Sequence, residues 1–205
     1  MQTVAIPPAT ARFVAALEAE LGVDKARLVL TCNVHGLPPQ AYAAERERWL
    51  ELGSVDAWLV DHHRRLMETL VLHAADGSLW YEQKIAPAVV DFARDHPEIQ
   101  SGVRDGDYIY VTKIPYDPAR FLKSTDPLEK RRLACHCPLA ASSITADSAG
   151  VPAAWCACSA GYEKFRFDIV FGQETEATVL KSVLAGDPLC RFAIRLPESA
   201  RQAVR

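Results

Sequence analysis

Apolar residues recur every three or four positions through most of the first hundred residues, which is the spacing of amphipathic helices. The first apolar stripe consists of Phe13, Leu17 and Leu21. Gly22 follows this stripe, and glycine commonly ends a helix because it adopts positive φ without steric cost. We expect a second helix that is capped by Asp24 and runs toward Cys32.

A longer helix is expected after Ser54, which is a good N-cap residue. Its apolar stripe consists of Trp58, His62, Leu66 and Leu70. Residues 76–77 then turn the chain into a short strand-like segment, residues 78–82. Another helix follows Pro87 and ends before His96, because the proline after this histidine disfavours helical backbone there.

The pattern changes at about residue 101. Residues 107–114 are rich in Tyr, Ile, Val and Thr, which favour strands. Asp126 and the proline after it open a short charged helix that leads to the first pair of cysteines. Ser159 is a good N-cap for a further helix, which we expect to stop at Gly172.

Two segments near the end of the chain, residues 174–184 and 189–196, predict an antiparallel hairpin around a Gly-Asp-Pro turn. Alternate residues of the second segment are apolar and face one way: Cys190, Phe192, Ile194 and Leu196. Cys190 is therefore expected at the inner end of an apolar face.

These elements predict an α+β fold, in which a helical N-terminal half packs on a mixed α/β C-terminal half that contains the antiparallel hairpin. Residues 1–100 form the mainly helical region, and residues 101–205 form the region that carries the cysteine pairs. At 205 residues the chain is long enough either for two small domains or for one compact domain.

Composition narrows the classes of function. Charged residues make up 24% and apolar residues 49%, the balance of a soluble globular protein. The net charge of −3 and the lack of a basic patch argue against a nucleic-acid partner. No apolar run approaches the roughly 20 residues that a membrane span requires. The first eight residues lack the features of a secretory signal, so we expect a cytoplasmic protein.

Cysteine is concentrated in the last third of the chain, where two Cys-x-Cys pairs are followed by a fifth cysteine. These residues are Cys135, Cys137, Cys156, Cys158 and Cys190. Clustered cysteines of a reducing compartment more often bind metal or do chemistry than form disulfides. A Cys-x-Cys pair can hold one metal only from extended or loop backbone, and Pro138 and Ser159 favour such backbone just before them.

Zinc suits this set of thiols best, since four thiolates at tetrahedral corners are a standard structural site. An iron–sulfur cluster is the less favoured alternative on ligand type. If four of the five thiols bind the metal, the fifth is free to react. If fewer than four bind it, the metal keeps an open coordination position. The cysteines could instead be packed as small apolar residues, or act as a redox switch or thiol catalyst. His136 is expected to project away from its two cysteine neighbours.

Cys32 and His35 resemble half of a zinc knuckle. On its own this spacing is weak, and we interpret the two residues as a buried thiol and a loop histidine unless the fold brings them beside the other cysteines. The common nucleotide-binding and hydrolase motifs do not occur in the sequence, which disfavours those functions.

The segment Gly-Asp-x-x-Cys-Arg-Phe at residues 186–192 resembles the 4-vinyl reductase domain superfamily, which includes the small-molecule sensing domains of aromatic-responsive transcription regulators. The fuller pattern of Cys-His-Cys-Pro, Cys-Ala-Cys-Ser-Ala-Gly-Tyr and Val-Leu-Lys-Ser-Val-Leu-Ala-Gly-Asp resembles an uncharacterised bacterial Cys-x-Cys family. That family is related to L-2-amino-thiazoline-4-carboxylate hydrolase-like proteins. The resemblance covers residues 107–197.

In the sensing domains, a Cys, a Glu and two further Cys hold zinc near a buried pocket for an aromatic ligand. By this resemblance the first and last of these ligands fall on Cys156 and Cys190. The middle two fall on Val179 and Ser182, which cannot replace that Glu and Cys. If the metal is retained, the other cysteines must supply the missing ligands.

An apolar ligand pocket beside the thiols could be walled by aromatic residues: Trp155, Tyr162, Phe165 and Phe192. The function that we expect is a zinc-binding protein that binds a small molecule. One alternative is a metal- or thiol-dependent hydrolase of a small cyclic amidine or thiazoline-like substrate, and another is an interaction protein held together by structural zinc. The partners expected are a small-molecule ligand and, as an open option, a second copy in a homodimer.

Overall fold

In the computed structural model, some helices begin or end at the residues that the sequence suggested and others do not. The structure describes residues 8–145 and 150–201. The first two helices are α1 (Ala9–Leu21) and α2 (Val23–Leu30), and Gly22 separates them with a φ of 77°. The N-cap of α2 is Gly22, so the expectation that Asp24 caps this helix is wrong. Asp24 lies in the first turn, where its negative charge meets the positive end of the helix dipole.

The next helices are α3 (Ala43–Leu52), α4 (Val55–Asp76) and α5 (Pro87–Asp95), and a short 3-10 helix, η1 (Pro39–Tyr42), precedes them. The long helix begins as expected, because the Ser54 hydroxyl accepts a hydrogen bond from the Ala57 amide. Its predicted stripe is confirmed, since Trp58, Leu66 and Leu70 are buried. A small hairpin, β1 (Leu79–Trp80) and β2 (Gln83–Lys84), connects α4 to α5.

The second half of the chain forms an antiparallel sheet of four strands in the order β3-β4-β6-β5. These strands are β3 (Val103–Asp105), β4 (Tyr108–Thr112), β5 (Glu176–Lys181) and β6 (Arg191–Arg195). The last two form the predicted hairpin, with shorter strands than expected and an irregular register between Val179 and Lys181. The central strands β4 and β6 pair Val111 with Phe192, and both residues are fully buried.

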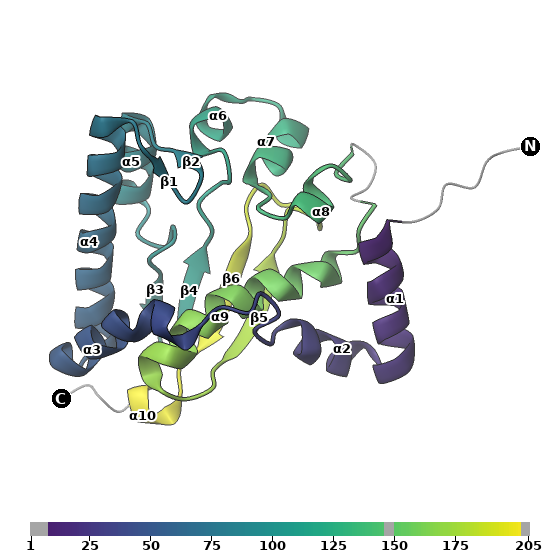
Figure 1. The fold of residues 1–205 in the computed structure, drawn as a ribbon, viewed down its shortest axis with the longest axis horizontal. Coiled ribbons are helices and arrows are strands. Elements are labelled where there is room, and N and C mark those ends of the chain that lie inside the picture. The colour runs from purple at the N-terminus through teal and green to yellow at the C-terminus, as the bar shows by residue number, and fades with distance from the viewer. Residues whose placement is uncertain (1–7, 146–149, 202–205) are drawn as a thin grey trace, which may run out of the picture.

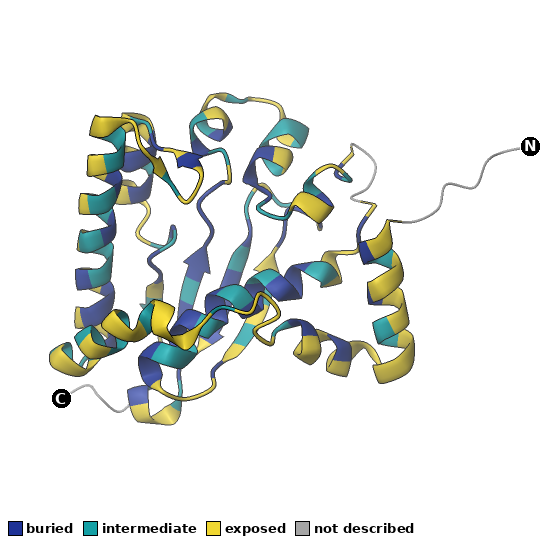
Figure 2. Cartoon of the chain, in the orientation of Figure 1, coloured by how far each residue is buried: buried dark blue, intermediate teal, exposed yellow. Residues whose placement is uncertain are grey.

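The helix α9 (Ala157–Phe171) lies across one face of this sheet (Figure 1). Figure 2 shows that α9 is largely buried, whereas the outer sides of α1 and α4 are exposed. Val55 and Trp58 of α4 join the same hydrophobic cluster as Ile109 of β4 and Phe167 of α9. The helical half and the sheet half therefore share a core, and the α+β class is confirmed.

Short helices connect the sheet to the cysteine pairs: α6 (Pro118–Lys123), α7 (Pro127–Ala134), α8 (Pro138–Ala141) and the 3-10 helix η2 (Ala153–Cys156), with α10 (Glu198–Arg201) at the end. The α7 helix opens as predicted, because Asp126 accepts a hydrogen bond from the Leu128 amide. Among the residues that the structure describes, no helix combines the length and apolar character needed to cross a bilayer. Residues 1–7, which supply most of the segment examined for a secretory signal, lie outside the described residues.

Candidate functional site

The first cysteine pair lies on extended backbone between two short helices, as expected. Cys135 has φ −76° and ψ 117°, and Cys137 has φ −92° and ψ 110°. Pro138 begins α8 immediately afterwards, and its fixed φ suits the first turn of a helix. The two side chains can therefore contribute to one site from a single short segment.

The second pair lies at the start of a helix, so the expectation of extended backbone there is wrong. Cys156 is the N-cap of α9 with φ −67° and ψ −8°, and Cys158 is inside the first turn. Ser159 is also inside the helix and does not cap it. The η2 turn leads directly into α9, which brings the helix start forward to the cysteines.

All five cysteines line one small cavity of about 20 Å³. This volume is that of about one water-sized sphere. The lining cysteines are Cys135, Cys137, Cys156, Cys158 and Cys190. All are free thiols. Within the described ranges, no three His, Cys, Asp or Glu side chains are already arranged as a metal-ligand set.

Cys156 and Cys190 contact each other directly in this cavity. The Cys156 thiol donates a hydrogen bond to Cys190, which lowers the pKa of Cys190 to about 7 and raises that of Cys156 above its usual range. The Ser182 hydroxyl donates to Cys156 Sγ at 2.9 Å, and the Val183 amide donates to Cys190. Cys190 is therefore the thiol of the pair that ionises first, and such a thiolate is the form that binds metal.

Lys113 brings a positive charge to the thiols. Its backbone amide donates to the Cys190 carbonyl at 3.0 Å, directly after β4. Burial raises the pKa of both Cys135 and Cys158 to about 11, and the Lys113 ammonium opposes this rise. Lys113 was not among the residues predicted from the sequence; the signal that could have found it is a lysine directly after a buried strand.

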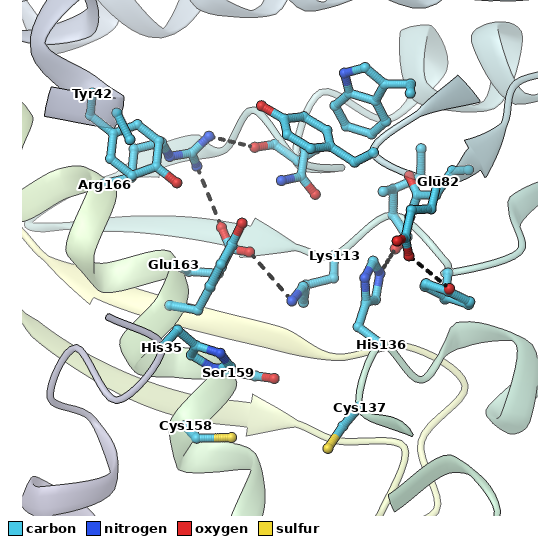
Figure 3. A pocket seen from close by; sticks show the side chains of 18 of the residues that line it. His35, Tyr42, Glu82, Lys113, His136, Cys137, Cys158, Ser159, Glu163 and Arg166 are labelled. Carbon is cyan, nitrogen blue, oxygen red and sulfur yellow. Dashed lines mark hydrogen bonds and ion pairs between the residues drawn. The ribbon is translucent and has the colours of Figure 1, made fainter. Parts of the chain in front are cut away.

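A second, larger cavity of about 620 Å³ adjoins the thiol cavity; we call it the main pocket. Figure 3 shows Cys137 and Cys158 at one end of this pocket, and Tyr42 and Arg166 away from them. Six residues line both cavities: Lys113, His136, Cys137, Trp155, Cys158 and Ser159. The thiol cluster therefore forms part of the wall of a pocket large enough for a small molecule.

The aromatic residues expected around a pocket divide into two groups. Trp155 and Tyr162 line the main pocket, and the Trp155 Nε1–H donates to Cys137 Sγ at 3.3 Å. Phe165 packs edge-on against the Tyr42 ring. Phe192 is fully buried in the core under the sheet. The periodicity of β6 placed Phe192 on the inner face, but could not say that α9 covers it.

His136 lies in the wall between the two cavities. Its Nε2 is 2.6 Å from the Ile114 carbonyl oxygen, which can only accept, so Nε2 carries the hydrogen. Burial lowers the pKa of His136 to about 4, and the charge of Lys113 adds to this effect. His136 is therefore a neutral imidazole whose Nδ1 can accept a proton.

The loop after α2 reaches the same region. His35 packs edge-on against Tyr162 at 5.3 Å and lines the main pocket. Cys32 is exposed, and its thiol donates to the Leu28 carbonyl. The fold thus places His35 near the cysteine pairs, whereas Cys32 points back along its own helix and is not the buried thiol that we expected.

The end of the main pocket away from the thiols is charged. Glu163 and Arg166, one turn apart on α9, are buried there. Behind them His62 lies 3.4 Å from a Glu45 oxygen, and Arg65 donates two hydrogen bonds to Glu45. This cluster was not predicted from the sequence, because charged residues on a helix normally indicate a solvent-facing side.

We expect acid to destabilise the protein through His62. Burial is the main cause that lowers its pKa, and Arg166 adds to it, while Glu45 opposes them. Because the unfolded chain binds this proton first, the free energy of unfolding falls as pH drops below about 6.5.

The pKa values of His35, His63 and His136 are also lowered. Denaturation in urea between pH 8 and pH 5 should show a shallower pH slope for His62→Gln than for the wild type. Equal slopes would contradict this role.

Comparison with known protein families gives one match. Residues 85–201, more than half of the chain, match the model of a family of unknown function, DUF6144. No curated protein and no solved structure matches the chain. The matched segment contains all five clustered cysteines, together with Lys113, Glu163 and Arg166.

Proposed function

We propose that this chain, which belongs to the DUF6144 family, is a cytoplasmic zinc-binding protein that binds a small molecule beside the metal. One observation carries the proposal: five cysteines line a cavity of about 20 Å³ whose wall is also the wall of a pocket of about 620 Å³. A metal held by these thiols would therefore lie next to a bound ligand.

The donor set fits zinc in its chemistry. Cys156 contacts Cys190, and Cys135 interacts electrostatically with Cys137 and Cys190. Cys158 interacts in the same way with Cys137, so the five thiols form one continuous group. Zinc favours thiolate ligands at about 2.3 Å, so four of these sulfurs would have to move to that distance from one point to hold it. When bound, zinc supplies positive charge that keeps its thiol ligands deprotonated.

The main pocket favours a ligand-binding role over a purely structural zinc. A structural site is closed and needs no cavity beside it, whereas here Cys137 and Cys158 line both spaces. By the resemblance to the sensing domains, Ser182 stands at the position of one of their zinc ligands; its hydroxyl contacts Cys156, but it supplies no thiolate, so the ligands here would have to come from the five cysteines.

A hydrolase of a small cyclic amidine or thiazoline-like compound is a second candidate. The observation that favours it is the position of His136 in the wall between the thiols and the main pocket, with Nε2 held by the Ile114 carbonyl. Its Nδ1 could take a proton from an attacking water or thiol, which is the task of a general base. Reaction with iodoacetamide in the presence of metal separates the two candidates: one hyperreactive cysteine favours covalent chemistry, and protected thiols favour a metal site.

We expect about one zinc ion per chain in protein purified without chelator. Elemental analysis measures the metal, and thermal unfolding before and after treatment with a chelator measures its effect on stability. Removing the metal should lower the melting temperature, because metal binding and folding are coupled. A metal-free preparation that is equally stable and gains nothing on addition of zinc would contradict the proposal.

A further inference from the structure

Within the described residues, Arg166 makes hydrogen bonds through only one of its three side-chain nitrogens. Its Nη1 donates to His62 Nε2 at 3.1 Å and to the Gln100 carbonyl at 3.0 Å. Its Nε and Nη2 are buried and have no hydrogen-bond partner in the described residues. Nε and Nη2 form one edge of the planar guanidinium, and this edge matches the two oxygens of a carboxylate.

Glu163 lies beside this edge and is only 2% exposed. Its Oε2 is 3.8 Å from Arg166 Nη2, and its Oε1 is 3.9 Å from Lys113 Nζ. Both distances exceed that of a hydrogen bond, so Glu163 attracts the two side chains electrostatically but forms no hydrogen bond with either. Oε1 has no hydrogen-bond partner within the described part of the chain. Figure 3 shows Glu163 between Arg166 and Lys113.

The unpartnered atoms are concentrated at this pocket. Six buried side-chain polar atoms lack a hydrogen bond in the ranges 8–145 and 150–201, and five belong to pocket residues: His62, Gln83, Glu163 and, with two atoms, Arg166. A buried polar atom without a partner costs about 1–3 kcal/mol. A ligand that offers the missing partners would remove this cost, so the unpartnered atoms indicate what such a ligand carries.

We propose that the main pocket recognises a small monocarboxylate that also carries a nitrogen donor. The carboxylate pairs with Nε and Nη2 of Arg166, and the nitrogen donates to Oε1 of Glu163. This inference rests on the proposed function, since it names the ligand class of the same pocket. The rest of the ligand then extends toward Cys137 and Cys158 at the opposite end.

The balance of charge favours a carboxylate over a phosphate dianion. The main pocket is lined by three acids, Glu45, Glu82 and Glu163, and by two permanent cations, Lys113 and Arg166. These five side chains sum to a net charge of −1 (three negative, two positive), so their net effect opposes a dianion about twice as strongly as a monoanion. The nitrogen donor of the ligand offsets that repulsion further, because it faces Glu163.

Three probes with the same phenyl group test this assignment on the full-length protein by calorimetry: L-phenylalanine, 3-phenylpropionate and 2-phenylethylamine. L-Phenylalanine should bind most tightly. Arg166→Lys should weaken the binding of L-phenylalanine and of 3-phenylpropionate by at least about tenfold, because it removes the bidentate hydrogen bonds to the carboxylate. The affinity for 2-phenylethylamine should not change, and this result would also show that the pocket of the variant is folded. Glu163→Gln should weaken the binding of the two probes that carry an amine, L-phenylalanine and 2-phenylethylamine, and should not weaken the binding of 3-phenylpropionate.

Arg46→Lys is the matched control. Arg46 contacts the same helix, through the carbonyls of Ile169 and Val170, but does not line the main pocket. Its replacement should change none of the three affinities. The inference is overturned if no probe binds the wild type, if Arg166→Lys weakens all three probes equally or none, or if phenyl phosphate binds more tightly than 3-phenylpropionate. If the purified protein contains no zinc and its binding of L-phenylalanine still depends on Arg166, this inference is supported and only the metal proposal is contradicted.

Discussion

Replacement of Cys156 or Cys190 by serine is expected to release the zinc and to destabilise the fold. Serine keeps the size of cysteine but provides no thiolate, and the side chains of these two residues contact each other in the cavity. Because structural zinc contributes its binding free energy to folding, we expect a loss of about 5 kcal/mol or more. For a chain of this length this corresponds to a decrease of roughly 10–20 °C in the melting temperature. Elemental analysis and calorimetry measure both effects.

The matched control is Cys32→Ser. The Cys32 thiol is exposed, donates to the Leu28 carbonyl of the preceding helix and does not line the thiol cavity, so neither zinc content nor stability should change. Serine variants of Cys135, Cys137 and Cys158 then identify which thiols complete the site. Full zinc content in both the Cys156→Ser and the Cys190→Ser variants would rule out the pair as ligands.

Gly161→Ala is expected to detach the α1–α2 helices from the rest of the protein. A Cβ at position 161 would lie 2.6 Å from the Thr31 carbonyl oxygen and 2.9 Å from that of Cys32. Both are backbone atoms, so they cannot move away as a flexible side chain would. We expect a loss of about 1–3 kcal/mol, as for other overpacked sites, although alanine is normally the better helix residue by about 1 kcal/mol.

Limited proteolysis locates this effect. Cleavage between residues 22 and 37 should become faster in Gly161→Ala, because α2 and the loop after it pack against α9 at this glycine. Gly77→Ala is the comparison, since an added Cβ there has open space and only the positive φ of 73° to oppose it. It should lower stability without faster cleavage in that region. Unchanged cleavage in Gly161→Ala would show that the helices do not depend on this close approach.

Local chemistry made most of the fold predictable. Ser54, Asp126 and Gly172 act at the helix ends where their side chains or positive φ suggested. The antiparallel hairpin followed from alternation and a Gly-Asp-Pro turn. The start of α9 was misjudged because Ser159 is a better cap by propensity than Cys156. The preceding 3-10 turn and the buried thiols determine the start instead, as tertiary contacts commonly override local preference.

The site was predictable only in its cysteines. Their clustering in sequence pointed to one location, and the five residues do line one cavity. Glu163 and Arg166 could not be found in this way, because each is a common surface residue whose burial depends on α4 and on the loop around Gln100. Lys113 could not be found either, because its place beside Cys190 depends on the pairing of β4 with β6, which are far apart in the sequence. Spacing along one chain carries little information about such long-range contacts.

The pairing of β4 with β6 joins segments from opposite ends of the second half of the chain. Contacts of such high sequence separation form slowly, because a long loop must close before they stabilise anything. Synthesis proceeds from the N-terminus, so residues 135–158 are made before β6, and the cavity lacks its fifth thiol until Cys190 is added and β6 pairs. We therefore expect the order of synthesis to make zinc capture a late event, and newly made chains to be most sensitive to oxidants just before their last strand docks.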